Sequence, residues 1–175
     1  MKVICYGDSN TYGYDPRDPL GGRYDMPWPQ WLANETGWTV INEGENGREI
    51  PKNPVAFPED ADLIILMLGT NDLLQFWPPE RVSDKMEQFL AGISRPLLLI
   101  APPTMVYGAW VQDRELIDDS ITLAECYRSL AQRLGIDFAD AGSWNIPLAH
   151  DGVHLTEEGH RIFAKALLQH LNKGD

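Results

Sequence analysis

The sequence predicts a three-layer α/β fold, with helices on both faces of a mostly parallel sheet. Short apolar runs of strand length alternate along the 175 residues with longer stretches in which apolar residues recur at helical spacing, and this order is typical of α/β proteins. The segment 62–68 is apolar without interruption after Asp62, as a strand covered on both faces requires, so it is predicted to be the central strand. No internal repeat or low-complexity segment is visible, and residues 1–175 are predicted to form one domain.

The first apolar run stops at Gly7, and Ser9 follows two positions later among polar residues that favour a turn and a helix start. In a parallel sheet, ligands bind outside the carboxyl ends of the strands. Ser9 is therefore in the position of a nucleophile, although Gly-Asp-Ser by itself is more often an ordinary turn. Asp8 either holds the loop around Ser9 by hydrogen bonds or caps the helix that begins there.

A loop, a helix and a second strand come next. Residues 11–22 are rich in proline, glycine and tyrosine, which predicts a loop over the end of the sheet. Tyr12 and Tyr14 in this loop either line an acyl pocket or simply pack against the protein. A helix is expected over residues 29–36, and a strand over residues 38–42.

The second half of the chain continues the alternation. Proline suits the first turn of a helix, as in the helix expected from about residue 77, and threonine is a common N-cap, as Thr156 is expected to be. Residues 104–112 carry more aromatic surface than a connector needs, so this loop is predicted to be a pocket wall. The other expected elements are a helix from about residue 77 with a stripe of Val82, Met86, Phe89 and Leu90, a strand at 96–101, a helix at 113–134, a strand at 136–140 and a terminal helix after Thr156.

Composition narrows the class of partner. The formal net charge is −12, and such a surface repels nucleic acids and anionic membranes, although solubility is the simpler reason for the acidity. No apolar run approaches the ~20 residues that span a bilayer, and the chain enters a strand without a leader pattern, so the expected compartment is the cytoplasm. Cys5 and Cys126 are interpreted as small buried hydrophobes rather than as a disulfide pair.

Polar clusters follow three of the predicted strands, and a fourth precedes the terminal helix. A serine nucleophile needs a base within hydrogen-bond reach and a carboxylate that orients this base. His154 and Asp151 supply both from one loop. Acyl transfer also needs hydrogen-bond donors around the oxyanion, a task suited to the amides of Ser9 and Gly47 and to the side chain of Asn71.

These clusters resemble the sequence blocks of the SGNH (GDSL-type) hydrolases, a family named for its Ser, Gly, Asn and His. The resemblance runs through almost the whole chain, with the blocks in the family's order, and it implies a flavodoxin-like five-stranded parallel sheet between helices. The similar stretches are Gly7-Asp8-Ser9 for the first block, Asn42-x-Gly44-x-x-Gly47 for the second, Gly69-Thr70-Asn71-Asp72 for the third and Asp151-x-x-His154 for the fifth.

The resemblance also implies roles for individual residues. The family's glycine of the second block can be placed on Gly44 or Gly47, and the spacing to the strand and the following Arg48 favour Gly47. The stretches around 12–14 and 43–48 are most similar to the arylesterase and acyltransferase branch, whose members often form homo-oligomers. The implied roles are nucleophile for Ser9, general base for His154, orienting carboxylate for Asp151, and oxyanion hole for Ser9, Gly47 and Asn71.

Some residues have other interpretations. His150 and His154, with Asp151 between them, can form a metal site. However, Gly152 disfavours the helix that would place the two histidines on one face, and no further ligand cluster is visible. The two histidines of the terminal helix, at positions 160 and 170, are expected to be surface residues.

The predicted function is that of a serine esterase that hydrolyses small, short-acyl carboxylic esters through an acyl-enzyme. Carbohydrate O-deacetylation and thioester cleavage use the same machinery and stay open, as does a small-molecule binding module without catalysis. The mechanism requires no cofactor and no metal. The aromatic side chains expected to form an apolar or sugar-stacking rim for the substrate are Tyr12, Tyr14, Trp77, Tyr107 and Trp110.

Overall fold

The computed structural model describes residues 1–18 and 20–172. Within these residues the sheet has five strands, all parallel, in the order β2-β1-β3-β4-β5. The α/β fold class and the central place of the 62–68 segment, which contains β3, are thus confirmed. The strands are β1 (Lys2–Gly7), β2 (Thr39–Gly44), β3 (Leu63–Met67), β4 (Leu97–Ala101) and β5 (Asp137–Asp140).

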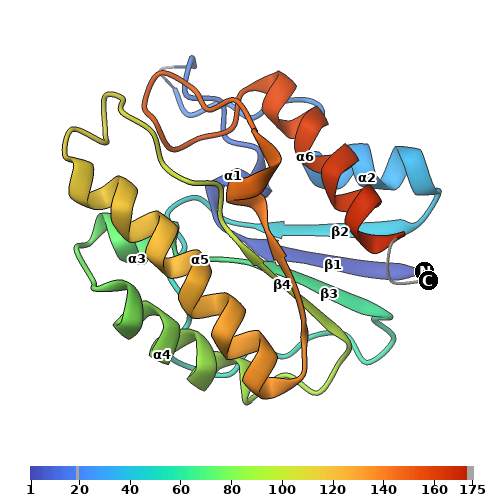
Figure 1. The fold of residues 1–175 in the computed structure, drawn as a ribbon. Helices are drawn as coiled ribbons and strands as arrows, with labels where there is room; N and C mark the ends of the chain where they lie inside the picture. The colour runs from blue at the N-terminus through green and yellow to red at the C-terminus, as the bar shows by residue number, and fades with distance from the viewer. Residues whose placement is uncertain (19, 173–175) are drawn as a thin grey trace.

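Helices cover both faces of this sheet (Figure 1). α2 and α6 pack together on one face, while α3, α4 and α5 lie on the other. The predicted helices are present with ends shifted by a residue or two, whereas the short helix α3 was not predicted. The helices are α1 (Ser9–Tyr12), α2 (Trp28–Thr36), α3 (Thr70–Leu74), α4 (Pro79–Leu90), α5 (Arg114–Leu134) and α6 (Glu157–Leu171), with a 3₁₀ turn at Ala141–Trp144.

The position of β3 at the centre of the sheet explains why its sequence is apolar without interruption. Ile64 and Leu66 belong to the core beneath α4 and α5, while Ile65 and Met67 belong to the core beneath α2 and α6. Successive side chains of a strand point to opposite faces, so a strand between two helical layers has no polar face. Each of these fully buried side chains contributes about 1.5–3 kcal/mol through the hydrophobic effect.

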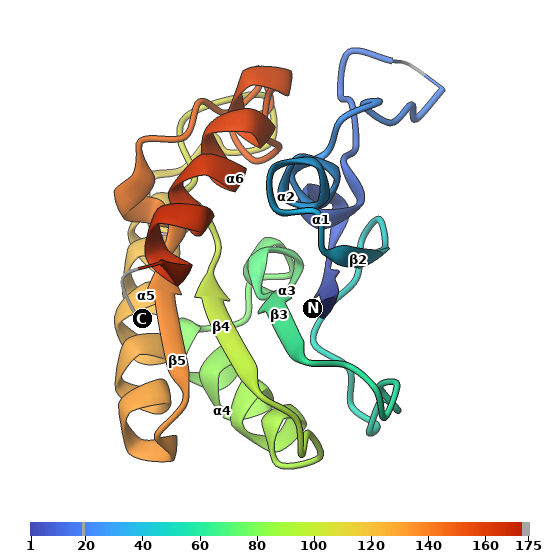
Figure 2. The same ribbon diagram turned by 90° about the vertical axis from the view of Figure 1, so that its right-hand side faces the viewer.

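The carboxyl ends of the strands carry the loops of interest. Gly7 at the end of β1 is in register with Gly44 of β2 and with Met67 of β3. The polar segments that follow these strands therefore begin at the same level of the sheet. Figure 2 shows these segments and the later loops gathered at one end of the molecule.

The expectation that His160 is a surface residue is wrong. Its side chain is fully buried, with Nδ1 accepting a 3.3 Å hydrogen bond from the Trp28 amide and with the Tyr24 ring 5.3 Å away. Helical spacing places position 160 on the same buried stripe of α6 as Phe163, Ala164 and Leu167. His170 is half-buried rather than exposed.

The burial of the two cysteines agrees only in part with the prediction that both are small buried hydrophobes. Both thiols are free. Cys5 is fully buried in β1, as expected, whereas Cys126 on α5 is half-buried. No disulfide therefore links the two cysteines.

Candidate active site

Ser9 is the first residue of α1, directly after β1. Asp8 is the N-cap: its Oδ1 accepts a 2.9 Å hydrogen bond from the Asn10 amide, and its carbonyl accepts those of Thr11 and Tyr12. An aspartate side chain satisfies an otherwise unpaired amide at a helix start. The capping role considered for Asp8 is thus confirmed. This turn presents Ser9 at the sheet end with 7% of its surface exposed.

Three polar side chains are hydrogen-bonded in series across this end of the sheet. Ser9 Oγ lies 2.9 Å from His154 Nε2, and His154 Nδ1 lies 2.7 Å from Asp151 Oδ2. The other carboxylate oxygen of Asp151 accepts the amides of Val153 and His154, each at 2.9 Å. All three side chains of the series are buried. The imidazole is therefore held between an alcohol and a carboxylate in a water-poor setting.

The carboxylate of Asp151 is ionised over the ordinary pH range. Burial raises its pKa, but hydrogen bonds from the His154 ring and from the main-chain amides of His154 and Val153 outweigh burial and lower the pKa to about 2. A carboxylate here favours a proton on Nδ1 of His154, which leaves a lone pair on Nε2 facing Ser9. The arrangement can remove a proton from the Ser9 hydroxyl and return it later.

The loop that carries Asp151 and His154 is supported by the 104–112 loop. The Val106 amide donates to the Gly152 carbonyl at 3.1 Å, and the Trp110 amide donates to the Asp151 carbonyl at 3.0 Å. A Cβ on Gly152, which has φ +84°, would lie 2.1 Å from the Val106 carbonyl oxygen. Glycine is required for this close approach of two backbones. The predicted pocket wall thus lies directly against the His154 loop.

Two of the five aromatic residues expected at the substrate rim flank His154. The ring centroid of Tyr14 is 4.7 Å from that of the imidazole, and the ring of Trp110 is 5.0 Å away, edge to face. Tyr14 comes from the loop after α1 and Trp110 from the 104–112 loop. Aromatic side chains thus lie on the imidazole from both loops.

The structure places the other three aromatic residues elsewhere. Tyr12 packs under the guanidinium of Arg23, at 4.8 Å. Tyr107 is 64% exposed and lies at the surface of its loop. Trp77 lies over Lys85, at 5.4 Å, in a separate hollow beside α4. Within the described residues, none of these three rings stacks on the imidazole of His154.

Asn71 and the loop after β2 meet at the end of β1. The Asn71 side-chain amide donates to the Arg48 carbonyl at 3.1 Å. The Arg48 guanidinium donates to the carbonyls of Gly7, at 2.9 Å, and Glu43, and lies 4.1 Å from the Tyr6 ring centroid. Arg48 thus joins the ends of β1 and β2 to α3. In the sequence, Arg48 only helps to place Gly47, and its position directly after the glycine block is the one signal of this role.

The two glycines of the second block lie in different surroundings. A Cβ on Gly44 would lie 2.0 Å from the Tyr12 amide, and the Gly44 amide already donates to the Asn42 side chain at 2.9 Å. Gly47 has φ +74° and is exposed, and a Cβ there would meet no atom of the described residues within 4 Å. Gly44 is needed for packing against α1, whereas Gly47 forms an open turn.

A buried ion pair that the sequence did not predict anchors α3. The Asp72 carboxylate is fully buried, contacts Lys85 Nζ, and accepts the Ile50 amide at 3.0 Å. Burial raises the pKa of Asp72, and the Lys85 ammonium opposes that rise. The available signal was a charged residue directly after Asn71 in a block followed by apolar positions. The pair fixes the helix that carries Asn71.

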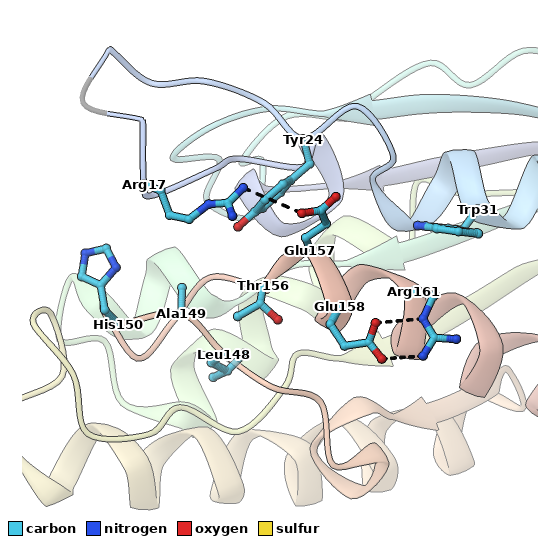
Figure 3. Close-up of a pocket in the computed structure, with 10 residues that line it drawn as sticks. All are labelled: Arg17, Tyr24, Trp31, Leu148, Ala149, His150, Thr156, Glu157, Glu158 and Arg161. Carbon is cyan, nitrogen blue, oxygen red and sulfur yellow. Dashed lines mark hydrogen bonds and ion pairs between the residues drawn. The ribbon is translucent and has the colours of Figure 1, made fainter.

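A hollow of about 620 Å³ lies beside the loop that precedes Asp151 (Figure 3). Tyr24 and Trp31 line it together with the carboxylates of Glu157 and Glu158. Arg161 is paired with Glu158 at 2.5 Å, and Arg17 lies 4.0 Å from Glu157. His150, one of the histidines of the alternative metal-site interpretation, lies in the wall of this hollow.

Two sequence interpretations concern metals and membranes. Across residues 1–18 and 20–172, no three His, Cys, Asp or Glu residues are grouped as a metal site would need. In the same part of the chain, no helix has the length and apolar character to cross a bilayer.

A parallel sheet with a serine, a histidine and an aspartate in hydrogen-bonded series at its carboxyl end is the architecture of a serine hydrolase. The model of the GDSL-like lipase/acylhydrolase family matches residues 5–162, and the chain belongs to this family. The protein is thus a serine ester hydrolase, and the resemblance to SGNH (GDSL-type) hydrolases is confirmed.

Solved structures agree with this assignment. A carbohydrate acetylesterase family member from Sinorhizobium meliloti is 27% identical, with a TM-score of 0.83 over 99% of this chain and 98% of that chain. A proposed arylesterase from Agrobacterium tumefaciens is 30% identical, with a TM-score of 0.76 over 99% of each chain. The aryl esterase of M. smegmatis, 24% identical, shares the fold, with a TM-score of 0.82 over 99% of each chain. Among proteins with curated descriptions, none matches at a significant level.

Proposed function

We propose that the protein hydrolyses small, short-acyl carboxylic esters through an acyl-enzyme on Ser9. The observation that carries this proposal is the series of hydrogen bonds at 2.9 Å and 2.7 Å that joins Ser9, His154 and Asp151. In the first step Ser9 Oγ attacks the ester carbonyl carbon while His154 Nε2 takes the hydroxyl proton. Asp151 stabilises the imidazolium that forms, since its own low pKa keeps it ionised.

The tetrahedral intermediate then collapses. The alcohol leaves with the proton held by His154, and the acyl group stays on Ser9. A water molecule attacks this acyl group while His154 takes a proton from the water. The second collapse releases the carboxylic acid and returns the proton to Ser9 Oγ.

The oxyanion of both intermediates needs preorganised donors. We assign this task to the amides of Ser9 and Gly47 and to the side chain of Asn71. The open turn at Gly47 and the tether of Asn71 to the Arg48 carbonyl support the assignment, since both groups lie beside the end of β1 where Ser9 follows.

The surroundings of the serine support a short acyl group. Ser9 is 7% exposed, and Tyr14 and Trp110 lie within 5.0 Å of His154 by ring centroid. A long acyl chain would have to displace these rings, whereas an acetyl or propionyl group occupies little space. Tyr12, Tyr107 and Trp77 lie away from His154, so we assign them no contact with the acyl group.

The test is hydrolysis of p-nitrophenyl esters of increasing acyl length by the wild type and Ser9→Ala. We expect the wild type to prefer the shortest esters, and Ser9→Ala to lose kcat by about 10⁴-fold or more. Ser129→Ala is the matched control, because this serine is exposed on α5 and donates to the Glu125 carbonyl, away from the candidate site. Wild-type turnover by Ser9→Ala would disprove the acyl-enzyme mechanism.

Deacetylation of a carbohydrate is a second candidate function. The S. meliloti relative, 27% identical, is described as a carbohydrate acetylesterase family member. The hollow in Figure 3 combines Tyr24 and Trp31 with paired carboxylates and arginines, which suits stacking and hydrogen bonding to a sugar. If sugars bind there, Trp31→Ala will lower kcat/KM for acetylated saccharides but leave p-nitrophenyl acetate hydrolysis unchanged. An equal effect on both substrates would argue against this site.

A further inference from the structure

Asn10 has no role in the mechanism above. It connects the serine turn, which is the turn between β1 and α1 that carries Ser9, to the main chain on both sides of His154. Its side chain is buried, with 3% of the residue exposed. The amide nitrogen Nδ2 donates to the Val153 carbonyl at 3.1 Å, and Oδ1 accepts the Leu155 amide at 2.9 Å. Val153 and Leu155 are the residues directly before and after His154. One side chain thus binds the main chain on each side of the histidine.

The two hydrogen bonds follow the pattern of one step of a β-ladder. In extended backbone, the carbonyl before a residue and the amide after it point the same way, and a neighbouring strand pairs with both. The carboxamide of asparagine is planar and carries one donor and one acceptor in a similar arrangement. It can therefore replace a missing strand beside His154. An aliphatic side chain in the same place would leave a buried amide and a buried carbonyl unpaired.

Asn10 is itself held rigidly with respect to Ser9. The two residues are adjacent in α1, and the Asn10 amide donates to the Asp8 side chain at 2.9 Å. A shift of the His154 loop away from Ser9 would have to break both side-chain bonds of Asn10. The contact between Val106 and Gly152, in contrast, joins this loop to the 104–112 segment.

We propose that Asn10 is a positioning residue that sets the separation of Ser9 Oγ and His154 Nε2. This inference rests on the proposed roles of Ser9 and His154. Proton transfer between them depends steeply on that separation, and a displacement of about 1 Å can lower a rate by about 10²-fold. The loss of Asn10 therefore lowers kcat and leaves KM nearly unchanged, because Asn10 is buried behind the reacting atoms.

The test compares Asn10→Ala, Asn10→Asp, Ser9→Ala and the wild type in p-nitrophenyl acetate hydrolysis and in labelling by a fluorophosphonate. We expect Asn10→Ala to lower kcat and the labelling rate by about 10- to 100-fold, with KM within about threefold of wild type. Thr36→Val is the matched control: Thr36 also makes two main-chain hydrogen bonds, to Leu32 and Trp38, but on α2. It should leave kcat unchanged.

Asn10→Asp adds a pH readout that a purely structural role would not move. Its carboxylate keeps an acceptor for the Leu155 amide but places an unprotonated oxygen against the Val153 carbonyl. A protonated carboxyl group can donate there instead. We expect the ratio of its kcat to that of the wild type to rise as the pH falls from 8 to 6. If Asn10→Ala does not fold, Asn10→Asp still tests the positioning role.

Two outcomes separate the inference from the proposed function. If Ser9→Ala is inactive while both Asn10 variants keep kcat within twofold of wild type at every pH, the positioning role is wrong and the proposed function stands. If Ser9→Ala hydrolyses esters like the wild type, the proposed function fails, and the role of Asn10 fails with it.

Discussion

The Ser9 hydroxyl and the His154 imidazole lie 2.9 Å apart although 145 positions separate them in the chain. Ser9 is held by the turn between β1 and α1, and His154 by a loop that packs against the 104–112 segment. The contact therefore depends on the packing of three loops at one end of the sheet. In the proposed mechanism, this preformed contact lets the first proton transfer begin without rearrangement of the protein.

Asp151→Asn should lower kcat by about 10⁴-fold with little change in KM. The asparagine oxygen can still accept the amides of Val153 and His154, but its NH₂ group would face His154 Nδ1. The imidazole would then carry its proton on Nε2 and could not accept one from Ser9. Steady-state kinetics on p-nitrophenyl acetate measures the effect.

The control for that substitution is Asp140→Asn. Asp140 likewise accepts a main-chain amide, that of Gly142, and pairs with Arg128. It does not belong to the hydrogen-bonded series of Ser9, His154 and Asp151. Its kcat should stay at the wild-type value. Equal kinetics for the two variants would remove Asp151 from the mechanism.

Asn71→Ala should lower kcat by about 10²–10³-fold, the effect of removing one oxyanion donor. KM for p-nitrophenyl acetate should change far less, because the oxyanion exists only in the transition state and the intermediates. Asn34→Ala, on the exposed side of α2, is the control. A rise in KM at constant kcat would show that Asn71 binds the ester in its ground state instead.

His160 makes the fold sensitive to acid. Burial lowers the pKa of its imidazole from 6.5 to about 3, and nearby His154 and Arg23 act in the same direction. The unfolded chain takes up the proton near pH 6.5, so stability from this group is present above that pH and is lost as the pH falls. Between pH 7.5 and 5.0 the loss is about 2 kcal/mol.

His160→Asn keeps an acceptor near the position of Nδ1 but has no group that titrates in this range. Denaturant unfolding at pH 7.5 and 5.0 should therefore show that the difference in unfolding free energy between wild type and variant shifts by about 2 kcal/mol in favour of the variant at pH 5.0. A difference that does not change with pH would mean that His160 does not titrate as a buried group.

Asp8 has the opposite effect on stability. Burial raises its pKa from 3.8 to about 6, against the hydrogen bond from Asn10 and the charges of His154 and Arg48. Its second oxygen, Oδ2, has no hydrogen-bond partner within the described residues. The folded state holds the proton more tightly than the unfolded chain, so this contribution is present at low pH and is lost as the pH rises through 6.

Asp8→Asn removes this titration while keeping an oxygen that can cap α1. Relative to the wild type, its unfolding free energy should gain about 2 kcal/mol between pH 4.5 and 7.5. Thermal or denaturant unfolding of the two proteins at both pH values measures the difference. A gain at pH 4.5 that equals the gain at pH 7.5 would contradict a raised pKa for Asp8.

Much of the fold could be predicted because its signals are local. The alternation of β1 to β5 with helices follows from strand-length apolar runs and helical spacing, and the buried run of β3 identified the centre of the sheet. The positions of Ser9, Asn71 and His154 at strand or helix ends could be read from the turn residues around them.

Other features could not be read from the sequence because they depend on contacts between distant segments. Tyr12 and Tyr14 are two positions apart in the sequence, yet the Tyr14 ring lies against the His154 ring whereas the Tyr12 ring lies under Arg23. His160 has the polarity of a surface residue, and its burial against α2 depends on how two helices pack.

By itself, the sequence determined the order of the elements, the polar blocks at their ends and the family to which these belong. Only the tertiary structure decided that Asn10 binds the main chain on both sides of His154, that Arg48 joins Gly7 to Asn71, and that Trp110 packs edge to face with the imidazole. The physical reason is the distance along the chain over which each kind of interaction acts. Backbone preferences and apolar periodicity act over a few residues, whereas hydrogen bonds and ring contacts at the site join residues that folding alone brings together.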